Sequence, residues 1–140
     1  MAEVILEKLA EDKNFKIQVT SAGTQAIDGI PAYPYARMAL RKNGYIDKKH
    51  VSKTISEELL QEHDCVITME VQQRDFLKFS FPQFGNRIHT LTELAMDMEM
   101  DIDDPIKLEY IVYEKTFKMI ENYTIKVFEK LIKKYKLECQ

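Results

Sequence analysis

The chain has 140 residues, of which 45% are apolar and 31% charged, and this composition is typical of a single globular domain spanning residues 1–140. Its formal net charge of -3 argues against nucleic acid as a partner, and no apolar run approaches the roughly 20 residues that cross a membrane. Cys65 and Cys139 form no Cys-x-x-Cys pair and no secretory leader is visible, so we expect no metal, no disulfide framework and a cytoplasmic location.

Residues 1–10 have the spacing of an amphipathic helix. Its apolar face consists of Ala2, Ile5, Leu6 and Leu9. No Ser, Thr, Asp or Asn precedes the first turn, so the helix lacks a side-chain cap. After a polar turn, residues 15–20 alternate apolar and polar side chains, which predicts a β-strand.

The middle of the chain alternates helix and strand signals. A short helix is expected over residues 35–42, ended by Asn43 and Gly44. Residues 54–57 have capping-box spacing, which predicts a helix through about Gln61. The apolar run 65–69 is typical of a buried parallel strand.

The last third is expected to be mostly helical. Residues 71–79 predict a helix, residues 81–86 a break, and residues 88–91 a last short strand. Residues 96–104 are acidic and irregular. A long helix should begin near Leu108, and its buried face should comprise Tyr113, Phe117, Ile120, Thr124, Val127 and Leu131.

Strands that alternate with helices predict an α/β fold with a parallel sheet. Two strands are well supported and a third is weaker, which is few for a chain with this many helices. The sheet is therefore expected to lack one strand, and the natural place for that strand is before Met1.

Four motifs follow one another along the chain: Ser21-Ala-Gly-Thr24, Gly44-Tyr-Ile-Asp47 with His50, Val66-Ile-Thr-Met69-Glu70, and Asp104-Pro105 before a long helix. In this order and spacing they resemble the low-molecular-weight protein tyrosine phosphatases and the related thiol-dependent arsenate reductases. The resemblance implies a three-layer parallel sheet flanked by helices, the phosphotyrosine phosphatase I-like fold, without its first central strand.

In the resembled family, that first strand leads into a Cys-(x)5-Arg loop just before the position of Met1. Neither Cys65 nor Cys139 has an Arg six positions later. We therefore expect that the chain is truncated at its N-terminus, either because the reading frame was started at an internal methionine or because the truncation is genuine. Since a central strand would be missing, we also expect a marginally stable fold, or one that rearranges or recruits a strand from elsewhere.

The family's chemistry assigns roles to particular residues. A cysteine thiolate attacks phosphorus, loop N–H groups and an arginine hold the phosphoryl oxygens, and an aspartate protonates the leaving group. By position Asp104 matches this general acid, Ser21 and His50 match residues that brace the loop, and Ile27 and Gly29 match the wall of the substrate pocket. No cofactor is implied, and the expected substrates of a chain with its loop restored are a phosphotyrosine protein or a small aryl phosphate.

Some features depart from the family or have simpler explanations. Ile106 and Lys107 replace the aromatic residues that often follow Asp-Pro, which puts a preference for aryl phosphates in doubt. The acidic run around Asp104 could simply be a solvated loop, and it lacks the glycine that a standard calcium loop needs. Cys65 is expected to be an inert core thiol.

Three functions are therefore open from sequence. The first is a phosphomonoester hydrolase that is inactive as given because its nucleophile loop is absent. The second is a non-catalytic phosphatase-like protein with a binding or regulatory role. The third is arsenate reduction by the complete protein, although the chain offers no matching pair of relay cysteines.

Overall fold

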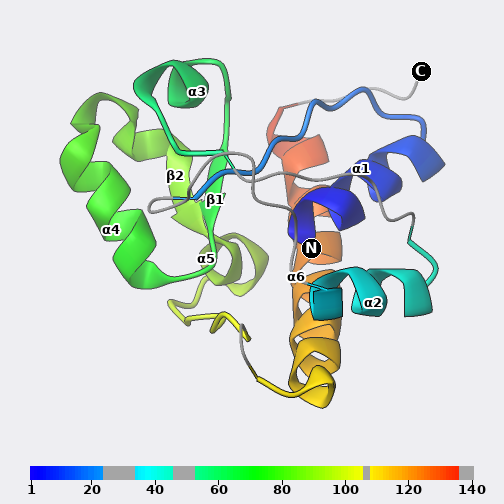
Figure 1. Ribbon diagram of the computed structural model, residues 1–140. Helices are drawn as coiled ribbons and strands as arrows, with labels where there is room; N and C mark the ends of the chain where they lie inside the picture. Colours follow the sequence, from blue (N-terminus) through cyan, green and yellow to red (C-terminus); the bar gives the residue numbers. More distant parts are fainter. Residues whose placement is uncertain (24–33, 46–52, 106–107, 136–140) are drawn as a thin grey trace.

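The computed structural model describes residues 1–23, 34–45, 53–105 and 108–135 (Figure 1). The helices and strands in chain order are α1 (Ala2–Asp12), α2 (Pro34–Lys42), α3 (Glu57–Gln61), β1 (Val66–Thr68), α4 (Val71–Ser80), the 3-10 helix η1 (Pro82–Arg87), β2 (Ile88–Thr90), α5 (Leu91–Met96) and α6 (Tyr110–Lys134). The expected helices over 1–10, 35–42, 71–79 and from 108 are confirmed, as are the strands at 65–69 and 88–91. In the described ranges, no helix has both the length and the apolar character needed to cross a membrane.

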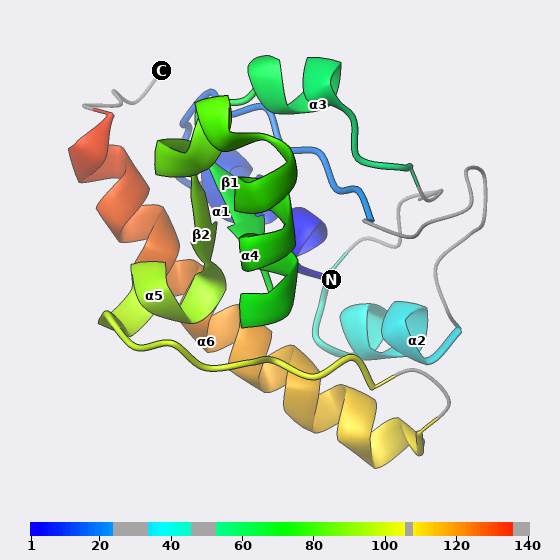
Figure 2. The ribbon, with the colours of Figure 1, turned by 90° about the vertical axis from the view of Figure 1, so that its left-hand side faces the viewer.

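The sheet lies between two layers of helices, as expected for the three-layer α/β fold. β1 and β2 are parallel, with Val66, Ile67 and Thr68 opposite Ile88, His89 and Thr90. Helix α4 covers one face of this sheet, and α1 and α6 lie on the other side (Figure 2).

Alternation along β1 places its side chains in two separate cores. Val66 packs against a cluster formed by Leu60, Leu77, Phe84 and Ile88. Cys65, Ile67 and Met69 pack against the larger cluster, which is centred on α6. Both faces of the sheet are therefore covered by apolar side chains, as parallel strands require.

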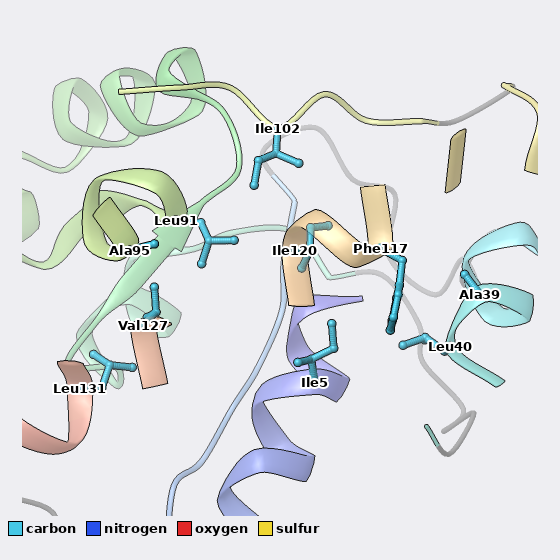
Figure 3. Packing of buried hydrophobic residues seen from close by; sticks show 10 residues of the cluster. All are labelled: Ile5, Ala39, Leu40, Leu91, Ala95, Ile102, Phe117, Ile120, Val127 and Leu131. Atoms are coloured by element: carbon cyan, nitrogen blue, oxygen red, sulfur yellow. The ribbon is translucent and has the colours of Figure 1, made fainter. Parts of the chain in front are cut away.

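The buried face of α6 is the one expected from its spacing. Tyr113, Phe117, Ile120, Thr124, Val127 and Leu131 are all buried. Phe117 lies between Ile120 of the same helix and Ala39 and Leu40 of α2, on the α2 side of the larger cluster (Figure 3). Helix α6 thus holds α1, α2 and the sheet together.

The prediction of a β-strand at residues 15–20 is wrong. Residues 16–22 belong to no helix or strand, and no backbone hydrogen bond joins them to another part of the described chain. Single bridges flank the segment, one at Phe15 and one at Gly23, which pairs in parallel with Thr54. Alternation makes a segment able to form a strand, but its N–H and C=O groups also need a neighbouring strand, and β1 is paired with β2 alone within the described ranges.

Two smaller expectations also differ from the structure. Helix α3 is present, but its cap is Ser56, whose hydroxyl accepts a hydrogen bond from the Leu59 N–H at 3.2 Å, instead of Thr54. Helix α5 was not expected. It begins with a complete capping box formed by Thr90 and Glu93, a pattern that the sequence does display.

Candidate active site

A groove of about 900 Å³ runs beside β1, and two of the sequence-predicted site residues, Ser21 and Asp104, line it. Its walls are residues 16–23 and residues 62–70, and its floor is the face of α6 that carries Thr116, Ile120, Thr124, Val127 and Leu131. Residues 1–4 and 102–105 lie at one end of it. We refer to this space as the β1 groove.

Asp104 lines the groove at the carboxyl end of β1. The Ile102 N–H donates to the Met69 carbonyl oxygen at 2.8 Å, which fixes the acidic segment against the residue that follows β1. Asp104 comes two residues later, is exposed, and is followed by the buried Pro105. A carboxylate at the carboxyl end of a parallel strand is in the usual place for a functional group of an α/β protein.

Hydrogen bonds and packing hold the segment just before Asp104 at three consecutive residues, 100–102. The Thr92 hydroxyl donates to the Met100 carbonyl oxygen at 2.9 Å and accepts from the Met100 N–H at 3.1 Å. Asp101 accepts from the Val71 N–H at 2.8 Å, which caps the start of α4. The Ile102 side chain points into the α6 cluster (Figure 3). These contacts hold residues 100–102 in one position.

Arg74 adds an ionic anchor to the same segment. Its side chain is buried and forms ion pairs with Glu93 of α5, with Glu99 at 2.9 Å and with Asp75 at 2.9 Å. The hydrogen bond to Glu93 is the main reason that the pKa of Arg74 is raised. Burial by itself would raise the pKa of Glu93, but its bonds to Arg74 and Thr90 outweigh this and lower it. The loop that follows α5 is thus tied to α4 as it runs toward α6 (Figure 2).

Ser21 lies in the same groove as Asp104. Its hydroxyl donates to a carboxylate oxygen of Glu3, in the first turn of α1. The structure therefore brings Ser21 and the start of α1 together at the groove. His50, Ile27 and Gly29 lie outside the described residues, so the structure does not place them.

The start of α1 opens into the groove without a side-chain cap, as expected. The first N–H groups of a helix have no intrahelical partner and carry positive partial charge, which favours anions. Burial lowers the pKa of the Met1 amino group, with Glu3 opposing the effect.

Cys65 is unsuited to act as a nucleophile here. Burial raises the pKa of its thiol, with Asp64 adding to the effect and Lys134 opposing it, so little thiolate forms at neutral pH. It precedes β1, whereas Asp104 lies beyond the other end of that strand. At roughly 3.3 Å per residue, positions 65 and 69 are about 13 Å apart, too far for both groups to act on one phosphoryl group.

Charged side chains of both signs line the groove. The carboxylates are Glu3, Glu62, Asp64, Glu70, Asp103 and Asp104, and the cationic groups are Lys16 and Arg37. A phosphate dianion in the groove would be repelled by the former and attracted by the latter. No group of His, Cys, Asp and Glu side chains in the described ranges is arranged to hold a metal ion.

Comparison with known proteins agrees with this geometry. A family model described as "Low molecular weight phosphotyrosine protein phosphatase" matches residues 1–137. A protein-arginine-phosphatase from Bacillus subtilis is 30% identical over 116 residues, which cover 83% of this chain and 77% of that protein. A probable low molecular weight protein-tyrosine-phosphatase EpsP from Ralstonia solanacearum is 26% identical over 75% of this chain and 70% of that protein.

Solved structures give the same result. A YwlE mutant from Bacillus subtilis superposes with a TM-score of 0.88 at 27% identity, covering 93% of this chain and 87% of that one. A low molecular weight protein tyrosine phosphatase from T. tengcongensis gives a TM-score of 0.88 at 29% identity, covering 92% of this chain and 88% of that one. The fold and the groove thus define a phosphatase-like α/β protein. The chain belongs to the low molecular weight phosphotyrosine protein phosphatase family, whose members hydrolyse phosphate groups on proteins.

Proposed function

We propose that this protein supplies the scaffold and the general acid of a phosphomonoester hydrolase that acts on phosphorylated proteins in the cytoplasm. The observation that carries the proposal is the placement of Asp104, held on an anchored segment at the carboxyl end of β1 beside the start of α1. In this role Asp104 donates a proton to the leaving group as the bond to phosphorus breaks.

The nucleophile and the phosphate-binding arginine come from residues other than these 140. No cysteine here is followed by an arginine at the required spacing, and Cys65 has a raised pKa at the wrong end of β1. The 140 residues on their own are therefore expected to be inactive.

A phosphoarginine substrate is a second candidate, favoured by acidic residues that line the groove. The guanidinium group that leaves from phosphoarginine is cationic, so Asp103 and Glu70 near Asp104 would attract it. A relative from Bacillus subtilis is a protein-arginine-phosphatase, and Ile106 and Lys107 stand where aromatic side chains would favour an aryl phosphate. Proton donation by Asp104 would then occur at the leaving nitrogen.

The test compares the 140-residue polypeptide with a form extended before Met1 by an apolar strand and a Cys-(x)5-Arg loop. Para-nitrophenyl phosphate, a phosphotyrosine peptide and a phosphoarginine peptide serve as substrates. We expect no turnover by the 140 residues and turnover by the extended form, abolished when the added cysteine is replaced by serine. Asp104→Asn in the extended form should lower kcat by about 10²–10⁴.

Two outcomes would contradict the proposal. One is turnover by the 140 residues that persists after Asp104→Asn, Cys65→Ser and Cys139→Ser together. The other is a folded extended form that binds phosphate and hydrolyses none of the three substrates, which would favour a binding or regulatory role. Activity that depends on arsenate and a thiol donor would identify the arsenate reductase alternative instead.

A further inference from the structure

The side of α6 that faces away from the core is rich in lysine. The buried residues of this helix recur at steps of three and four from Tyr113 to Leu131. Its exposed residues recur at the same steps on the opposite side, from Ile111 to Lys133. Five of these exposed residues are lysines, namely Lys115, Lys118, Lys126, Lys130 and Lys133. We refer to this surface as the α6 outer face.

The charge of the α6 outer face is one-sided. Within α6, which the structure describes from end to end, Glu129 is the one exposed carboxylate. Five lysines and one glutamate give the face a net charge of +4, whereas the whole chain carries -3. Lys134, whose charge acts on Cys65 and His89 of the sheet region, is not part of the face. Such segregation of charge favours binding to an anionic surface through this side of the molecule.

The two partly buried carboxylates of α6 are turned away from the outer face. Glu114 accepts hydrogen bonds from the Asn43 side-chain amide and from the Tyr110 hydroxyl, both at 3.0 Å. Glu121 accepts from the Tyr45 hydroxyl at 2.6 Å. Both therefore lie on the side of α6 that packs against α2 and the residues after it.

The positive charge is strongest over the second half of α6. Lys118 lies 3.9 Å from Glu121, and the acidic loop after α5 runs past the first half of the helix (Figure 2). Beside the second half, α1 and the residue after it carry exposed groups of both signs, Glu11, Asp12 and Lys13, so their net contribution is small. Three lysines, at positions 126, 130 and 133, then lie within two turns of helix.

Apolar side chains stand among the lysines. Ile111, Met119 and Ile125 are 58%, 41% and 37% exposed. A solvated polyanion, such as an acidic protein segment, offers no apolar phase for such groups. A lipid bilayer offers both parts of the match, because anionic headgroups attract lysine and the region beneath them takes up apolar side chains.

The shape of the α6 outer face also suits a flat surface. From Lys115 to Lys133 the helix rises about 27 Å at 1.5 Å per residue. Helix α6 lies along one border of the molecule (Figure 2), so a planar surface can reach its whole length. Long lysine side chains can lay their apolar stems along the helix while their ammonium groups reach anionic oxygens.

We propose that the α6 outer face binds the surface of a lipid bilayer that contains anionic lipids. The lysines bind the headgroup phosphates, while Ile111, Met119 and Ile125 enter the headgroup layer. The helix lies flat on the bilayer and does not cross it. None of these residues lines the β1 groove, which lies on the other side of α6, so the inference does not rest on the proposed hydrolysis.

The test measures co-sedimentation of the 140-residue polypeptide with lipid vesicles. One set of vesicles is phosphatidylcholine alone, and the other contains about one third phosphatidylglycerol, which is anionic. We expect binding to the anionic vesicles only. The affinity should fall by about tenfold or more when the salt concentration rises from about 0.05 M to about 0.5 M, because exposed charges are screened.

Paired variants locate the binding surface. Lys126→Gln with Lys133→Gln should weaken binding by about 25-fold, since each lysine near an anionic bilayer contributes about fivefold. The matched control, Lys16→Gln with Lys53→Gln, removes the same charge from exposed positions outside the α6 outer face and should leave the affinity unchanged.

The apolar contribution is tested by Met119→Ser with Ile125→Ser. This pair should weaken binding by about threefold or more without changing the salt dependence. All the substituted side chains are exposed, so the urea midpoints should match that of the wild type.

Equal binding to neutral and anionic vesicles would overturn the proposal, as would equal losses in the two lysine double variants. Binding to poly-glutamate without binding to either vesicle would also overturn it and would indicate an acidic protein partner. If a variant fails to fold, the response of the wild type to lipid charge and salt still decides the outcome. A phosphatase assay that fails while the vesicles bind as described would count against the proposed function only.

Discussion

Residues 16–22 and strand β1 both line the same groove, yet only β1 is bonded as a strand. β1 has β2 on one edge, α4 on one face and the α6 cluster on the other. Residues 16–22 have no neighbouring strand within the described chain, although their side chains alternate as a strand's should. The comparison teaches that a strand is specified by its partner as much as by its own sequence.

Hydrogen exchange should give the largest difference between these two segments. The amides of 66–68 that bond to β2 exchange only when the sheet opens, whereas those of 16–20 are already unbonded. If sheet opening costs about 3 kcal/mol, exchange in β1 should be slower by about 100-fold after correction for intrinsic rates. Mass spectrometry or NMR measures this, with the middle of α6 as a protected reference. Equal exchange in both segments would remove the distinction.

Phe117→Ala should destabilise the whole domain, including both strand β1 and residues 16–22. Phe117 is fully buried, contacts Tyr45 edge-to-face with ring centroids 5.5 Å apart, and belongs to the cluster that joins α1, α2 and the sheet. The expected loss in the free energy of unfolding is about 3–5 kcal/mol, measured by urea titration. The control Ile111→Ala lies on the same helix at an exposed position and should change it little. A similar loss in both variants would show that α6 does not form the shared core.

Arg74→Gln should affect only the region that contains the sheet. It leaves the partly buried Glu93 without its cation, and the expected loss is about 2 kcal/mol, since Glu99 and Asp75 are exposed and contribute little. Residues 97–102 should lose protection from exchange while α1 keeps it. Lys130→Gln, an exposed control on α6, should have no such effect.

The same ion pair predicts a pH dependence. The folded pKa of Glu93 lies below its unfolded value of about 4.3, so its contribution is complete above that value and is lost as pH falls through the folded pKa. The wild-type chain should therefore lose more stability than Arg74→Gln between about pH 5 and pH 3. Parallel losses in the two proteins, measured by urea titration at each pH, would exclude the Glu93 contribution.

Ser56→Ala should have the smallest effect, confined to α3. Removing the cap of a five-residue helix should cost about 1 kcal/mol. Ser80→Ala, at the exposed end of α4, is the matched control and should change the free energy of unfolding by a few tenths at most. An equal effect of both substitutions in urea titration would show that the Ser56 hydroxyl does not cap α3.

Much of the fold was predictable because it depends on local pattern. The face of α6 follows from helical spacing alone, and the run 65–69 reads as a buried strand because it is apolar throughout. Helix α5 could have been found from Thr90 and Glu93, which form a capping box. Residues 15–20 were predicted wrongly because pairing depends on a partner that their own sequence does not reveal.

The candidate site was predictable only in part. Asp104 and Ser21 were predicted from a family resemblance, and both line one groove. The ion pair of Arg74 with Glu99, which holds the acidic segment, could not have been predicted from sequence motifs. The two residues are 25 positions apart, and only the packing of the fold brings them together. The meeting of Glu3 and Asp103 at one groove was likewise hidden, since the two residues lie far apart in the sequence.

The Thr92 hydroxyl has a consequence for how the loop responds to acid. It holds Met100 by donating one hydrogen bond and accepting another, and it carries no charge. The ionic tether at Arg74 weakens as carboxylates gain protons, but this neutral tether does not change with proton concentration. Acidification is thus expected to loosen the loop around Glu99, as Arg74→Gln does, but to leave the contact between Thr92 and Met100 in place.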